Sequence, residues 1–138
     1  MDVSQVDRSK YYRGLLVLTG RDLDIDPRER ELMLRFGKVL DFDKRFCEAA
    51  INDVLHNKYL PSEPVVFDNR ETAECFLHDA IRLALIDDAM HPEELAWLQD
   101  VAGANGLPVT WLDAEISRFL DLKGVPEGSL EIERLLAG

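Results

Sequence analysis

The chain contains the same short acidic phrase twice, and this duplication constrains the fold more than any other feature. The first copy runs from Asp22 to Glu29 (DLDIDPRE) and the second from Asp87 to Glu94 (DDAMHPEE). Both read Asp-x-x-(Ile/Met)-x-Pro-x-Glu, and matched positions lie 65 residues apart, as 22 and 87 or 29 and 94 do. Each copy follows an apolar stretch with helical spacing and begins another. The repeat therefore predicts two related helix-loop-helix units, each with an acidic loop.

Helical spacing of apolar residues continues through the rest of the chain. It predicts helices over about 8–20, 27–41, 43–57 and 70–86, then from 92 to a stop at 106, from 110 to a stop at 124, and from about 129 onward. No segment has the alternation of a strand. We expect an all-α fold of about seven helices in a single domain over 1–138, with residues 1–7 flexible.

Several finer expectations concern packing. Leu120 falls on the apolar side of its helix and is predicted to be buried, and Phe46 is one of the apolar positions at helical spacing in the helix over 43–57. The long connection over 58–69 contains the apolar tip Val65-Val-Phe67, which we expect to pack back onto the core. Gly37 inside a helix costs about 1 kcal/mol relative to alanine, so a close helix crossing is expected there.

Composition and charge limit the function classes. The formal net charge is −11, which argues against binding nucleic acid through its phosphates and permits cations or basic partners. Cys47 and Cys75 lack metal-site spacing and lie in apolar stretches, so we expect buried free thiols in a reducing compartment. No apolar run long enough to span a membrane and no signal peptide is present. The sequence predicts a cytoplasmic protein.

The two loops form the main candidate site, a divalent-cation site. Hard cations such as Ca²⁺ and Mg²⁺ bind where several carboxylate oxygens converge, and oxygen ligands favour them over Zn²⁺. An Asp at the end of one helix and a Glu one turn into the next would supply two such ligands per loop. The candidate ligands are Asp22, Asp24, Glu29, Asp87, Asp88 and Glu94.

Helix capping is the alternative role for these acids. Asp26 and Glu29 occupy the positions of a capping box around Pro27, and acids in a first helical turn are favoured by the helix dipole. The two roles are compatible. An EF-hand is excluded because that loop requires Gly at its sixth position and Glu at its twelfth, where this chain has Pro27 and Met33.

No catalytic constellation is present in the sequence. His56 and His78 have no evident partner, and His91 falls at a helix cap. No metalloprotease, phosphate-loop or nucleophile-elbow motif occurs. The acids are expected to be exposed, whereas a general acid needs a pKa raised by burial. We expect a non-catalytic protein, with an acid-dependent hydrolase as the remaining catalytic alternative.

The segment ALIDDAMHPEEL over 84–95, together with Asp22 to Glu29, resembles the acidic loops of the TerB-like (tellurite-resistance) family, which also includes the N-terminal domain of a membrane-anchored J-domain co-chaperone. The resemblance covers about residues 15–106. It implies an all-helical fold, a metal-binding acidic cluster at Asp22, Glu29, Asp87 and Glu94, and a stress-response role with protein partners, peripheral to the inner membrane. The chain departs from the family pattern where Leu23 and Asp88 replace the glycine after each first Asp.

Two hypotheses follow. The first is a TerB-like module that binds a divalent cation through its loops and docks onto a stress-response or membrane-associated protein. The second is a metal-free protein-protein interaction domain whose acids only cap helices.

Overall fold

The computed structural model describes residues 3–20, 26–56, 63–86, 90–121 and 130–137. Within these ranges it contains seven helices and no strand, so the predicted all-α fold is confirmed. The helices are α1 (Gln5–Thr19), α2 (Pro27–Val39), α3 (Lys44–His56), α4 (Arg70–Ala84), α5 (Pro92–Ala104), α6 (Val109–Asp121) and α7 (Glu131–Ala137). In the described part of the chain no helix is long and apolar enough to cross a membrane.

The first six helices are two copies of one three-helix unit. α1 spans residues 5–19 and α4 spans residues 70–84. α2 spans residues 27–39 and α5 spans residues 92–104. α3 spans residues 44–56 and α6 spans residues 109–121. Every bound in the second unit is therefore the matching bound in the first plus 65. In each unit all three helices pack against one another, α1 with α2 and α3, and α4 with α5 and α6. The predicted repeat thus extends from the loops to the whole unit.

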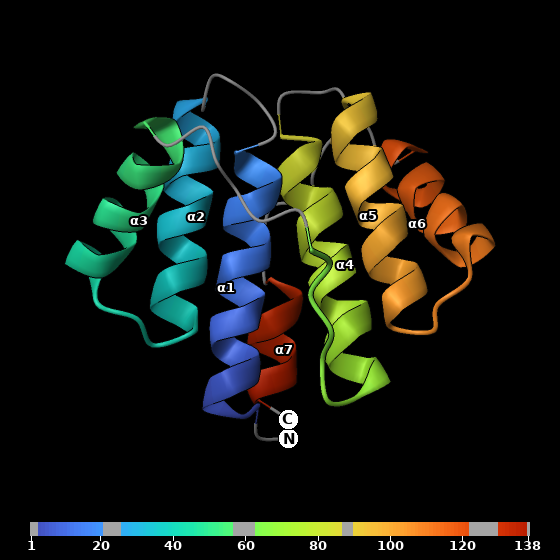
Figure 1. Cartoon of the computed structure of the whole chain (residues 1–138), viewed down its shortest axis with the longest axis horizontal. Helices are drawn as coiled ribbons and strands as arrows, with labels where there is room; N and C mark the ends of the chain where they lie inside the picture. Colours follow the sequence, from blue (N-terminus) through green and yellow to red (C-terminus); the bar gives the residue numbers. More distant parts are fainter. Residues whose placement is uncertain (1–2, 21–25, 57–62, 87–89, 122–129, 138) are drawn as a thin grey trace.

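The two units meet along their first helices. α1 and α4 stand side by side in the centre, with α2 and α3 on one side and α5 and α6 on the other (Figure 1). α7 packs against α4. α1 and α4 end, and α2 and α5 begin, at the same end of the molecule (Figure 1). This arrangement brings the described parts of both copies of the repeated phrase, 26–29 and 90–94, to one end.

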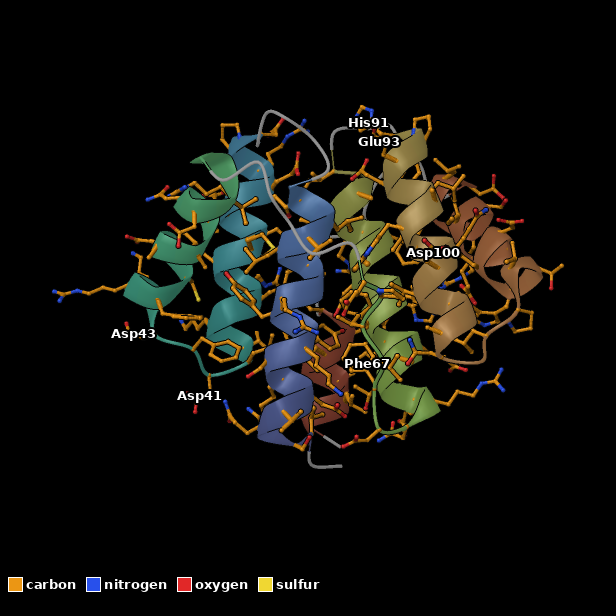
Figure 2. All side chains as sticks on the ribbon, viewed as in Figure 1. Asp41, Asp43, Phe67, His91, Glu93 and Asp100 are labelled. Atoms are coloured by element: carbon orange, nitrogen blue, oxygen red, sulfur yellow. The ribbon has the colours of Figure 1, made fainter. Side chains whose placement is uncertain are left out.

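Aromatic side chains fill the contact between the units. The ring centroids of Tyr11 and Phe76 lie 5.2 Å apart, and Phe67 lies 5.8 Å and 5.2 Å from the two. Phe67 belongs to the segment that precedes α4 and runs along the front of that helix (Figure 2). Val65 and Phe67 are buried, which confirms the predicted packing onto the core for these two residues, whereas Val66 between them is 47% exposed.

Helix starts and stops correct several predicted boundaries. Residues 1–7 were expected to be flexible, but α1 begins at Gln5, and Val3 and Asp7 are buried. The reason is that Ser4 caps α1 by accepting the Asp7 N–H at 3.1 Å, while the Asp7 carboxylate accepts the Asp68 N–H at 3.2 Å.

The capping-box start predicted over Thr110 to Asp113 is wrong, because α6 already begins at Val109. The carbonyl of Pro108 accepts the N–H of Trp111 at 3.1 Å and that of Leu112 at 3.3 Å, so Pro108 takes the capping position. At the preceding turn Gly106 has a φ of 75°, and its counterpart Asp41 has a φ of 68°. Both units therefore leave their second helix through a left-handed residue.

One packing prediction is wrong. Leu120 is 53% exposed, although it was expected to be buried, and the apolar position Phe46 is 55% exposed. Each belongs to the outermost helix of its unit, α3 or α6, where apolar periodicity continues beyond the surface that a neighbouring helix covers (Figure 1). The close crossing predicted at Gly37 is confirmed, because a Cβ there would overlap the sulfur of Cys47.

Candidate functional site

The start of α2 contains the described part of the first acidic phrase. Asp26 caps the helix, and its Oδ1 accepts the Arg28 N–H at 2.8 Å. The Arg28 side chain also donates to this carboxylate, at 3.2 Å from Nε and 3.1 Å from Nη2. These hydrogen bonds from Arg28 hold the pKa of Asp26 below its ordinary value. Asp26 therefore caps α2, and its negative charge is balanced by Arg28 in the first turn of the same helix.

The start of α5 repeats this arrangement with different residues. His91 takes the capping position, Pro92 follows it, and the Glu94 Oε1 accepts the His91 N–H at 3.1 Å. This is the reciprocal half of a capping box. The capping role predicted for the third residue of the helix is therefore confirmed for Glu94.

Glu29 and Glu94 are the two described members of the predicted cation site. They occupy matched positions, and each has a relative exposure of only 4%. The expectation that these acids are exposed is therefore wrong for both. Acids in a first helical turn usually face solvent, whereas these two are buried in the first turns of α2 and α5, which begin at the same end of the molecule (Figure 1).

The other predicted ligands, Asp22, Asp24, Asp87 and Asp88, lie outside the described residues. Within the described ranges no group of three or more His, Cys, Asp or Glu side chains has an arrangement that could hold a metal ion. The only predicted ligands that the structure places are thus one buried carboxylate per unit.

Asp79 is a buried polar residue that the sequence analysis missed. It lies in α4 with no exposed surface, and its carboxylate accepts three hydrogen bonds. Oδ2 accepts from the Tyr11 hydroxyl at 2.6 Å and from the Ile132 N–H at 3.0 Å, and Oδ1 accepts from the Glu131 N–H at 2.9 Å. Asp79 therefore joins α1, α4 and the first turn of α7.

The surroundings of Asp79 shift two pKa values. Burial raises the pKa of Asp79 to about 6, although the hydrogen bonds it accepts and the charge of Arg82 oppose the shift. Burial and the adjacent carboxylate raise the pKa of Tyr11 well above its ordinary value. At neutral pH the pair is a carboxylate and a neutral phenol, joined by a hydrogen bond that links α1 to α4.

His78 has a partner that its sequence position did not reveal. Its Nε2 lies 3.3 Å from the Glu115 Oε2 in α6, and its ring lies 5.5 Å from that of Trp111 and 6.2 Å from that of Phe119. Glu115 also accepts from the Arg118 Nε at 2.9 Å. The group therefore forms a partly buried contact between α4 and α6.

Both cysteines are free thiols, as predicted. Cys47 is buried, as predicted, whereas Cys75 was expected to be buried and is only half-buried. Burial and the nearby carboxylate of Asp79 raise the pKa of Cys75 to about 12. A thiol with this pKa is protonated at neutral pH, so Cys75 is a poor nucleophile.

Comparisons of the chain with protein-family models, with curated proteins and with solved structures find no match.

Proposed function

We propose that the chain is a non-catalytic binding module that holds a divalent cation between its two acidic loops and docks onto a protein partner. The observation that carries the cation half is the burial of Glu29 and Glu94, at 4% exposure each. A buried ionised carboxylate is costly unless a hydrogen-bond donor or a cation compensates it. Two buried carboxylates at matched positions, in first turns that lie at the same end of the molecule (Figure 1), are suited to a shared cation in addition to the partners that they already have.

The first Asp of each phrase would complete the ligand set. Asp22 follows α1 and Asp87 follows α4, and these two helices end beside each other (Figure 1). Oxygen ligands alone favour Ca²⁺ or Mg²⁺ over Zn²⁺. The resemblance of both phrases to the TerB-like family supports the same site and a role in a stress response.

A metal-free interaction domain is the second candidate, and the capping geometry favours it. Glu94 already accepts the His91 N–H, and Asp26 accepts the Arg28 N–H. In this alternative the acids only complete the first turns of α2 and α5, and the function lies in the surface that docks the partner.

A thermal melt separates the two candidates. The protein is treated with chelator and then melted alone and with Ca²⁺, Mg²⁺, Mn²⁺ or Zn²⁺. A cation at 100 times its dissociation constant adds about 2.7 kcal/mol to the free energy of unfolding. That corresponds to a rise in Tm on the order of 10 °C for a chain of this length.

The decisive variant is Glu29→Gln with Glu94→Gln, because Gln can still close a capping box but removes a charged ligand. The matched control is Glu31→Gln with Glu93→Gln, which alters exposed acids in the same two helical turns. The cation proposal expects the Tm shift to vanish in the first variant and to persist in the control. No shift with any of the four ions in the unaltered protein would leave the metal-free alternative.

A further inference from the structure

The outer helices of the two units differ sharply in charge. Residues 92–121, which include α5 and α6, contain six acidic residues and one basic residue, Arg118, for a net charge of −5. The matching residues 27–56, which include α2 and α3, contain six acidic and six basic residues, for a net charge of zero. The same backbone arrangement therefore has a balanced surface in the first unit and a strongly negative one in the second.

The difference is clearest on the third helix of each unit. In α3, Lys44 lies 3.9 Å from Glu48 one turn later. The matching residues of α6 are Val109, which is 45% exposed, and Asp113, which makes no ion pair within the described part of the chain. An apolar side chain replaces the counterion of the first unit.

These α6 residues form a stripe with Leu120. Residues at positions 109, 113 and 120 fall on one side of a helix, because spacings of four and eleven residues return close to the same direction. The stripe is about 16 Å long, at 1.5 Å per residue. Val109 and Leu120 are two of the five large apolar side chains that are markedly exposed in the described structure.

The neighbouring α5 presents a second stripe. Glu93, Ala96, Asp100 and Gly103 are exposed and recur at helical spacing on one side of the helix. Figure 2 labels Glu93 at its start and Asp100 further along. A Cβ on Gly103 would meet no atom within 4 Å, so the surface is open above it. Neither Glu93 nor Asp100 makes an ion pair among the described residues.

We propose that these two stripes form a docking surface for a basic amphipathic helix of a partner protein. We call it the acidic face, and it consists of Glu93, Ala96, Asp100 and Gly103 on α5 with Val109, Asp113 and Leu120 on α6. It rests on the docking half of the proposed function and is independent of the cation.

The chemistry of the acidic face defines its occupant. The exposed side chains of Val109 and Leu120 bury apolar area only against an apolar stripe. The unpaired carboxylates around them require Lys or Arg on the flanks of that stripe. An amphipathic helix supplies both at a spacing of three to four residues. The small residues of α5 let the backbone of such a helix approach closely.

The test uses a synthetic helical peptide of leucine and lysine with one apolar stripe, and a second peptide of the same composition scrambled to remove the stripe. Binding to the full chain is measured by calorimetry in chelator, so that failure of the cation proposal does not affect the result. The striped peptide is expected to bind at least tenfold more tightly than the scrambled one. Asp113→Lys with Leu120→Ser is expected to weaken binding of the striped peptide at least tenfold.

The duplication supplies the matched control. Glu48→Lys with Phe46→Ser makes the same charge change at the matching position of the first unit and removes an exposed apolar side chain there. This variant is expected to bind the striped peptide as the unaltered protein does. The proposal is overturned if both variants lose affinity equally, if the scrambled peptide binds as tightly as the striped one, or if the striped peptide does not bind.

Discussion

The two units make the same contact with each other twice, once with polar and once with apolar side chains. Tyr11 in α1 donates a hydrogen bond to Asp79 in α4. The residue that matches Tyr11 in the second unit is Phe76, and the residue that matches Asp79 in the first unit is Gly14. Phe76 and Gly14 also lie against each other. A Cβ added to Gly14 would lie 2.6 Å from the Cζ of Phe76. Such exchange of matched residues is what a two-fold relation between units requires.

The difference between the two contacts follows from what covers them. Beside Gly14 lies Val65, whose matching residue beside Asp79 is Leu130, just before α7. The first unit's segment satisfies its backbone through Asn105, which accepts the Phe67 N–H at 2.9 Å and donates to the Val65 carbonyl at 2.8 Å. The second unit's segment begins a helix, whose first N–H groups need an acceptor, and Asp79 supplies it. The same backbone arrangement therefore has two different sets of hydrogen bonds, from Asn105 to the segment before α4 and from the start of α7 to Asp79.

Removing the Asp79 carboxylate is expected to have the largest effect on the free energy of unfolding. Asp79→Ala leaves the Tyr11 hydroxyl and the N–H groups of Glu131 and Ile132 buried without an acceptor. Each costs about 1–3 kcal/mol, partly offset because a buried charge is also removed, so a net loss of about 3 kcal/mol is expected from urea denaturation.

Tyr11→Phe is the control for this change, because it installs the residue of the matching position and removes one donor only. A loss of about 1 kcal/mol is expected. If Asp79→Ala were as stable as the unaltered protein, the packing of α7 against α4 would not depend on this carboxylate. The proposed difference between the polar and the apolar contact would then be wrong.

The charge of Asp79 predicts a pH dependence that the apolar contact cannot have. Burial raises its pKa from 3.8 to about 6, so the folded chain binds this proton more tightly than the unfolded chain does. The contribution to stability is fully present below about pH 4 and is lost as the pH rises through 6. A shift of this size corresponds to about 3 kcal/mol.

Comparison with Asp79→Asn isolates this group from the other titrating acids. The free energy of unfolding of the unaltered protein, minus that of the Asn variant, is expected to fall by about 3 kcal/mol between pH 3 and pH 8. Chemical denaturation at a series of pH values gives this difference. Parallel curves for the two proteins would mean that the pKa of Asp79 is the same in the folded and unfolded chains.

Much of the fold was accessible from the sequence because its signals are local and occur twice. Pro27 and Pro92 mark the starts of α2 and α5, and Gly106 marks the end of α5. The exposure of Phe46 and Leu120 was not accessible. Periodicity gives the apolar side of a helix, but whether a further element covers that side depends on contacts distant in sequence.

The candidate sites were less predictable. The partners of Asp79 are Tyr11, Glu131 and Ile132, which lie 52 to 68 residues away. A signal was nevertheless present, because an Asp stands inside the apolar stretch of α4 at the position that matches Gly14. The burial of Glu29 and Glu94 was missed because capping positions are usually exposed. The acids Asp22, Asp24, Asp87 and Asp88 lie outside the described residues, so their part in a cation site stays a prediction.

The apolar contact is expected to give the smallest of these effects. In Gly14→Ala the new methyl group would lie 2.6 Å from the Cζ of Phe76 and 3.2 Å from the Cγ2 of Val65, so buried groups must move. Overpacking of this kind costs about 1–3 kcal/mol, and the better helix propensity of alanine returns up to about 1 kcal/mol. We expect a net loss of about 1 kcal/mol by urea denaturation.

Gly103→Ala is the control, because α5 is open there and only the propensity gain of up to about 1 kcal/mol applies. Equal effects of the two substitutions would mean that the units do not meet closely at Gly14, and the contact with Phe76 would then not be the counterpart of the contact between Tyr11 and Asp79.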